Sequence, residues 1–127
     1  QEKLIRLAKN YDIEVTAFSP LGSISYEELG GAKEEESLIR NKTIKSISTD
    51  LDVTPAQLIL SWALNRGTSI VVKSTDEDRM KENLEALEIR LDQSVTDKIS
   101  ALNMDKRYND PGEFCEDAFN TFFPIYD

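Results

Sequence analysis

The run SIVVKS at residues 69–74 constrains the fold most strongly, because its apolar residues do not alternate with polar ones. A strand of this kind is typical of a parallel sheet that is covered on both faces. An earlier β-rich run, VTAF at residues 15–18, is closed by the Pro and Gly of SPLG. Helical patterns precede, separate and follow these strands. Strands that alternate with helices predict an α/β protein with a parallel sheet.

The helix that is best marked in the sequence is TPAQLILSWALNRG at 54–67. Thr54 can cap it, Pro55 suits its first turn, and Gly67 lies just past its end. Spacing and composition predict further helices at 2–11, 38–51, 76–87 and 93–104. In the last of these, Ser94 and Asp97 form a pattern like a capping box.

Two segments carry no regular pattern. Residues 23–37 are polar and loop-like, and the acidic run at 34–36 is typical of a solvated surface. Residues 105–127 form an irregular tail that is rich in aromatic residues. Two strands are too few for a stable sheet covered on both faces, and Gln1 already lies within a helical pattern. Both features predict a fragment or a processed product.

Composition excludes several classes of function. The chain has 15 basic and 24 acidic residues, a net charge of -9, so the basic surface of a general nucleic-acid binder is missing. No run approaches the roughly 18 apolar residues of a membrane helix, and no signal peptide opens the chain. The absence of histidine excludes histidine triads, bases and zinc ligands. Cys115 is the single cysteine, so no internal disulfide forms and a cytosolic location is expected.

Lys73 stands where the second strand ends, and ligands of α/β proteins bind at the carboxyl ends of strands. Ser74 and Thr75 then open a helix whose free N–H groups and dipole favour an anion. Arg79, about one turn further, can fork onto a phosphate. Asn83 is one turn beyond Arg79 and shares its face of the helix.

A plainer alternative is a capped surface helix with solvated charges. The acids at 76–78 support it, because acids in a first turn suit the helix dipole. No GxGxxG or GxxxxGK[ST] motif is present, so neither a Rossmann nor a P-loop phosphate site is predicted. Phe18, at the end of the first strand, is either a core residue or a ring that stacks on a flat ligand. Cys115 has no histidine to activate it and is interpreted as a plain thiol.

Four stretches together resemble the C-terminal half of the aldo-keto reductases, in that family's order. They are VTAFSPLGS, TPAQLILSWALNRG, IVVKSTDEDRMKENLEALEIRL and DKRYNDPGEF. The most specific part is the pattern K-S-x4-R-x2-E-N, and the aldose and xylose reductase-like members are the most similar. The resemblance implies an α/β fold, the C-terminal portion of a (β/α)8 TIM barrel. Residues 1–104 would form the partial barrel, with its last two strands, their helices and an added helix. Residues 105–127 would form a substrate-loop tail.

The resemblance also implies NADP(H) as the cofactor. By position, the adenosine 2′-phosphate would be held by Lys73, Ser74 and Arg79, and the adenine would be contacted by Glu82 and Asn83. Thr75 is assigned to the cofactor site in general. The pyrophosphate would run along Ser19, Leu21 and Ser23, and Phe18 would stack under the nicotinamide. The substrate wall would include Tyr108, Phe114, Phe119 and Phe122.

The sequence departs from the family pattern at several points. Val72 replaces the usual Pro, and the acid that closes a loop over the cofactor falls near Ser25, with Glu27 or Glu28 as substitutes. The family's catalytic Asp, Tyr, Lys and His lie on earlier strands, so no catalytic residue is assigned and the isolated chain is predicted to be inactive. Its expected partners are a small-molecule carbonyl substrate and the missing N-terminal half of the barrel, or another chain.

Two functions therefore remain open. The first is the C-terminal part of an NADP(H)-dependent reductase that converts aldehydes, ketones or sugars to alcohols by hydride transfer. The second is a non-catalytic binding or regulatory protein that retains part of the barrel. Such a protein would pair with a partner through its exposed sheet edges and its aromatic tail.

Overall fold

A computed structural model describes residues 1–22, 24–27, 32–108 and 110–120. Its sheet consists of two parallel strands, β1 (Thr16–Phe18) and β2 (Ser69–Val71), within the two runs expected from the sequence. Ala17 is paired with Ile70, and Phe18 with Val71. The two strands therefore end at the same edge of the sheet.

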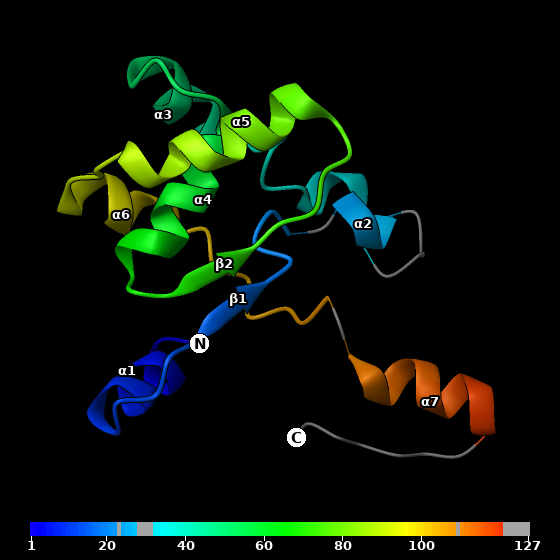
Figure 1. Cartoon of the computed structure of the whole chain (residues 1–127). Coiled ribbons are helices and arrows are strands. Elements are labelled where there is room, and N and C mark those ends of the chain that lie inside the picture. Colours follow the sequence, from blue (N-terminus) through cyan, green and yellow to red (C-terminus); the bar gives the residue numbers. More distant parts are fainter. Residues whose placement is uncertain (23, 28–31, 109, 121–127) are drawn as a thin grey trace.

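Helices make up most of the remaining structure. In chain order they are α1 (Glu2–Asn10), α2 (Ile24–Glu27), η1 (Glu34–Glu36), α3 (Lys42–Asp50), α4 (Pro55–Asn65), α5 (Glu77–Glu85), η2 (Ala86–Glu88), α6 (Gln93–Ser100) and α7 (Pro111–Phe119). Figure 1 shows α3 to α6 gathered on one side of the sheet, whereas α1 and α7 extend away from this group. No helix among the described residues is long and apolar enough to cross a membrane.

Two segments that the sequence predicts to be irregular contain helices. In the segment 23–37, η1 is closed by the Glu36 carboxylate, which accepts from the Lys33 backbone N–H at 2.8 Å. In the tail, the Asp110 carboxylate accepts from the Gly112 N–H at 2.9 Å and caps α7. An acidic cap followed by Pro111 is a local signal for the start of a helix. The prediction of an irregular tail rested on its aromatic composition and did not use this signal.

The predicted caps are confirmed at α4 and wrong at α6. Thr54 accepts from the Gln57 N–H at 3.1 Å, and the Gln57 side chain accepts from the Thr54 N–H at 3.0 Å. At α6 the cap is Asp92, which accepts from the Val95 N–H at 2.8 Å, and Ser94 donates to the same carboxylate. Ser94 already lies inside the first turn, so it is too late in the chain to serve as the cap residue.

The core lies where α3, α4 and α6 meet. Its buried members are Ile44, Ile47, Leu58, Ile59 and Ile99. Helix α4 is buried over most of its circumference and also contacts α5 and β2. A helix that is apolar nearly all round must lie in the interior, and α4 therefore organises the other elements.

The sheet is covered on one face only. Thr16, Phe18, Ser69 and Val71 are exposed, while their neighbours Ala17 and Ile70 are half-buried. Phe18 exposes 71% of its surface and Val71 57%. The expectation of a strand buried on both faces is therefore wrong for this chain, because helices α3 to α6 cover one side and the two strands do not close into a barrel.

Candidate functional site

The candidate site lies at the edge of the sheet where both strands end. β1 is followed directly by Ser19, whose backbone φ of 50° is left-handed, and β2 is followed by Val72 and Lys73. Because Phe18 is paired with Val71 in a parallel register, the segments after the two strands leave the sheet side by side. This is the edge at which α/β proteins bind ligands.

Helix α5 begins later than the sequence predicts. Its first residue is Glu77, and Ser74 and Thr75 precede it. The Ser74 hydroxyl accepts from the Asp76 N–H at 3.1 Å, and the Asp76 carboxylate caps the helix by accepting from the Arg79 N–H at 3.0 Å. The acidic cap of the plainer alternative is therefore present, and one of the N–H groups that an anion would use is already bonded.

A cavity of about 550 Å³ lies between β2 and α5. Three predicted cofactor residues, Lys73, Ser74 and Asn83, line it together with apolar side chains of both elements. Arg79 and Thr75 are exposed and do not line it. Within the described residues, neither the Lys73 ammonium nor the Arg79 guanidinium makes an ion pair. Both cationic groups are therefore available to an anion.

Glu82 is engaged within the chain. Its carboxylate accepts a hydrogen bond from the Thr54 hydroxyl, and one turn further Glu85 accepts from the Gln57 amide at 3.0 Å. Both acids thus contact the capping residues of α4, so they fix α5 against the start of α4. From the sequence, Glu82 is predicted only to contact adenine, and its contact with Thr54 is not predicted. The local signal was the i, i+3 spacing of two acids, which places them on one face of a helix.

The predicted residues after β1 have different environments. The Ser19 hydroxyl lies 3.3 Å from the Tyr26 hydroxyl. Leu21 packs against the hydrophobic core and is half-buried, whereas Phe18 points away from that core on the open face of the sheet. Ser23 lies outside the described residues.

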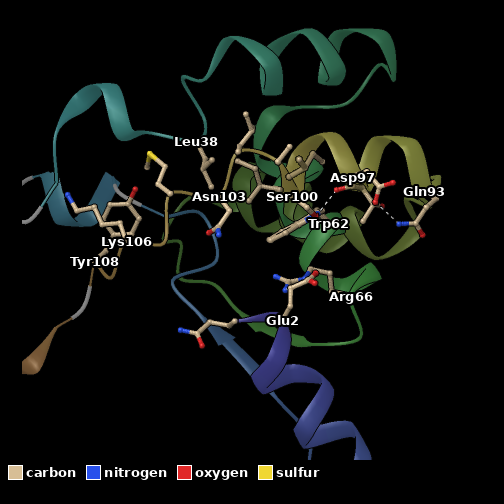
Figure 2. A pocket seen from close by; sticks show the side chains of 17 residues that line it. Glu2, Leu38, Trp62, Arg66, Gln93, Asp97, Ser100, Asn103, Lys106 and Tyr108 are labelled. Atoms are coloured by element: carbon tan, nitrogen blue, oxygen red, sulfur yellow. Dashed lines mark hydrogen bonds and ion pairs between the residues drawn. The ribbon is translucent and has the colours of Figure 1, made fainter. Parts of the chain in front are cut away.

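Of the predicted substrate wall, the structure describes the side chains of Tyr108 and Phe119. Phe119 is 75% exposed on α7. Tyr108 lines a second cavity, of about 630 Å³, between α6, α4 and the residues after α6 (Figure 2). Lys73, Ser74 and Asn83 do not line this second cavity, so the structure does not bring Tyr108 and Lys73 into one pocket. The side chain of Phe114, and Phe122 altogether, lie outside the described part of the chain.

The floor of the second cavity is formed by Trp62 of α4. Its indole N–H donates to the Ser100 hydroxyl at 3.2 Å, and the Arg66 guanidinium lies 4.5 Å from the centre of its ring. Glu2 lies 3.8 Å from Arg66 on the outer side (Figure 2). Trp62 therefore joins Ser100 and Arg66 at this side of the cavity, and Arg66 joins Glu2.

Among the residues that the structure describes, three ionisable groups have shifted pKa values, and two of them lie together. The Lys106 ammonium holds the pKa of Glu36 below its usual value, and burial raises the pKa of the nearby Tyr108 hydroxyl. At α6, the Val95 N–H that donates to Asp92 lowers the pKa of that carboxyl. No group of His, Cys, Asp and Glu residues within the described ranges is arranged to hold a metal ion.

Comparison with known proteins identifies the family. A sequence model of the aldo/keto reductase family matches residues 1–104. The chain belongs to the aldo/keto reductase family. The resemblance inferred from the four sequence stretches is thereby confirmed.

Curated relatives are similar over nearly the whole chain. An NAD(P)H-dependent D-xylose reductase of Kluyveromyces lactis is 38% identical over 125 residues, which are 96% of this chain and 38% of that protein. A 4-dihydromethyl-trisporate dehydrogenase of Mucor mucedo is 37% identical over 112 residues, 87% of this chain and 35% of that protein. The chain therefore spans a little over a third of the length of these relatives.

Solved structures give the same result for the fold. An aldo/keto reductase from Brucella melitensis is 30% identical, with a TM-score of 0.66 over 81% of this chain and 34% of its own. An aldo-keto reductase from a deep-sea metagenome library is 24% identical, with a TM-score of 0.69 over 83% of this chain and 36% of its own. The expected fold class, a C-terminal portion of a (β/α)8 barrel, is confirmed.

Proposed function

We propose that this chain supplies the NADP(H)-binding portion of an aldo-keto reductase that reduces the carbonyl group of an aldehyde, ketone or sugar to an alcohol. The observation that carries the proposal is the shared cavity of Lys73, Ser74 and Asn83 at the carboxyl end of β2. Family membership adds support, as do relatives named for NAD(P)H-dependent reduction of D-xylose.

The residues present fit the cofactor's adenosine end. A 2′-phosphate requires cationic and hydroxyl donors, and Lys73, Arg79 and Ser74 provide them. Asn83 presents an amide to the same cavity as Lys73, and an amide can both donate to and accept from an adenine edge. In this proposal Thr75 adds a hydroxyl at the exposed turn, and Glu82 acts by holding α5 in place through Thr54.

Residues after β1 would serve the other half of the cofactor. The exposed ring of Phe18 offers a flat apolar surface for the nicotinamide, and Ser19, Leu21 and Ser23 would follow the pyrophosphate. When bound, the nicotinamide supplies the hydride for carbonyl reduction. This chain would bind and orient the cofactor, and the acid that protonates the substrate oxygen would come from outside it. Residues 105–127, with Tyr108, Phe114, Phe119 and Phe122, would border the substrate.

We propose that the remaining strands of the barrel, or another chain that replaces them, cover the open face of the sheet. Phe18 and Val71 are exposed there although both are apolar. Open sheet faces and edges favour association with another strand-bearing segment.

The proposed location is the cytosol. This proposal rests on the single cysteine and on the small-molecule chemistry.

The alternative is a non-catalytic binding or regulatory protein. The apolar side of α1 favours it, since Leu4, Leu7 and Tyr11 lie on one helical face and each is more than half exposed. A protein of this kind would use these surfaces to bind a partner and would not need NADP(H).

Calorimetric titration of the 127-residue chain with NADP⁺ and NAD⁺ distinguishes the two functions. We expect tighter binding of NADP⁺, and about tenfold weaker NADP⁺ binding for each of Lys73→Ala and Arg79→Ala, the loss of one charge-assisted contact. Lys81→Ala is the matched control, because Lys81 is a cation of the same helix that is paired with Glu77 at 3.5 Å. Equal affinity for both nucleotides, or unchanged binding by both variants, would contradict the phosphate assignment. Failure of the chain to bind either nucleotide would favour the alternative.

A further inference from the structure

A network of side chains joins two segments that are about 70 residues apart in the sequence. The Lys106 ammonium, after α6, donates to both carboxylate oxygens of Glu36 in η1, at 2.7 and 2.8 Å. The Glu36 side chain is 19% exposed and that of Lys106 34% exposed. An ion pair that is bonded at both carboxylate oxygens is more persistent than a typical surface pair.

Aromatic contacts reinforce the same junction. The Tyr108 hydroxyl donates to the Glu36 backbone carbonyl at 3.4 Å, and the Lys106 ammonium lies 5.3 Å from the centre of the Tyr108 ring. Tyr108 also stacks on Tyr26 of α2, with ring centres 6.0 Å apart and an interplanar angle of 22°. Figure 2 shows Lys106 and Tyr108 together at one end of the larger cavity, away from Trp62.

The network reaches the carboxyl end of β1 through Tyr26. The Tyr26 hydroxyl lies 3.3 Å from the Ser19 hydroxyl. Ser19 has a φ of 50°, and its carbonyl accepts from the Gly22 N–H at 2.9 Å. A left-handed conformation is unfavourable for a residue with a Cβ atom, so it persists only where its surroundings hold it.

We propose that Tyr26, Glu36, Lys106 and Tyr108 form a clasp that closes the loop after β1 and the segment after α6 as one unit, and that the clasp positions Ser19. Each member is a positioning residue, since it acts on the site through Ser19. The relevance of Ser19 to the cofactor rests on the proposed function, whereas the closure of the two segments does not.

Joint closure has a mechanical consequence. Release of Lys106 from Glu36 removes the ion pair between η1 and the segment after α6, so that only Tyr108 still joins them, through its hydrogen bond to the Glu36 backbone carbonyl and its stack on Tyr26. A shift of Tyr26 would then move its hydroxyl away from that of Ser19, which lies 3.3 Å from it. The segments that border the two ends of the proposed site would therefore open and close together.

Hydrogen–deuterium exchange of the 127-residue chain without nucleotide tests the clasp separately from the proposed function. The readouts are amides in the two segments: Ser37 and Arg40 in the loop, and Asn103 and Asp105 after α6. We expect Glu36→Gln and Lys106→Met to raise exchange about two- to fivefold in both segments, the range of a solvent-accessible ion pair. Glu35→Gln, in the same turn as Glu36, and Lys98→Met, on α6, are the matched controls and should change neither segment.

Two tyrosine variants test the hydroxyl contact with Ser19 and the stack of the two rings separately. Tyr26→Phe keeps the ring stack and loses the hydroxyl, so it should accelerate exchange of the Gly22 amide and leave residues 101–108 unchanged. Tyr108→Leu loses the stack, so it should accelerate exchange of the loop amides, of the amides after α6 and of the Gly22 amide. Faster exchange in only one segment of Glu36→Gln would overturn joint closure, and an unchanged Gly22 amide in Tyr26→Phe would overturn the positioning of Ser19. Far-UV circular dichroism identifies any variant that fails to fold, and Tyr26→Phe, the most conservative change, keeps the proposal testable in that event.

Discussion

At the scale of the residue, Asp76 has two opposing effects. Its carboxylate caps α5 through the Arg79 N–H and so stabilises the helix that carries Arg79 and Asn83. The same negative charge lies three residues from both Lys73 and Arg79 in the sequence. It therefore opposes the binding of a second anion at this helix terminus.

Two substitutions at this position separate the effects. Asp76→Ala is expected to lower the free energy of unfolding by about 1 kcal/mol, because the cap is lost. Asp76→Asn keeps a capping oxygen and removes the charge, so stability should change little and NADP⁺ affinity should rise roughly threefold, as expected for one dipole-scale charge effect. Urea unfolding and calorimetric titration measure the two quantities. Asp78→Asn, a first-turn acid that makes no cap, controls for the charge alone, and equal stability of both Asp76 variants would contradict the capping role.

At the scale of the element, α4 connects the core to the site. Leu58 and Ile59 are buried in the core on one side, and Ser61 donates to the carbonyl oxygens of Gln57 and Ala86 on the other. Thr54 and Gln57, at its start, contact Glu82 and Glu85 of α5. The position of α5, which carries part of the proposed cofactor site, therefore depends on α4.

Leu58→Ala tests this dependence. Leu58 is fully buried, so the substitution should lower the free energy of unfolding by about 2–5 kcal/mol. Leu51→Ala is the comparison, because Leu51 is 42% exposed and its loss should cost much less. Thermal and urea unfolding measure both, and similar losses at the two positions would show that α4 is not central to the core.

At the scale of the whole molecule, acidic pH should lower the free energy of unfolding through two carboxylates, those of Glu36 and Asp92. The pKa of Glu36 is lowered by the Lys106 ammonium and the Lys33 backbone N–H, which both donate to its carboxylate, and by the positive charges of the two lysines. The pKa of Asp92 is lowered by the backbone N–H groups at the start of α6 and by the Ser94 hydroxyl. A lowered folded pKa means that the stabilisation is complete above the ordinary carboxyl pKa and is lost as pH falls through the folded value.

Unfolding experiments between neutral and acidic pH check this expectation. The wild-type chain should lose stability as the pH falls below the ordinary carboxyl range, and Glu36→Gln should show a weaker dependence because one of the shifted groups is gone. Its stability at neutral pH should be lower than that of the wild type. If Glu36→Gln and the wild type have identical pH profiles, the Lys106 pair does not contribute to stability.

The elements whose signals are local were predictable. VTAF and SIVVKS contain both strands, and Thr54, Pro55 and Gly67 mark the ends of α4 as the structure has them. Each of these signals lies within the segment it describes, in side chains adjacent to the backbone groups they satisfy. Where two local signals competed, as with Ser94 and Asp92 at α6, the sequence alone did not decide which residue is the cap.

What the sequence by itself determined was therefore the family, the two strands with helices α1 and α3 to α6, and the cluster from Lys73 to Asn83 after the second strand. Only the tertiary structure decided that Glu82 contacts Thr54, that Lys106 contacts Glu36, and that Phe18 lies on an open face. The physical reason is sequence separation. Propensities and caps act within one turn of the backbone, whereas these contacts join residues that are brought together only when the helices pack around α4.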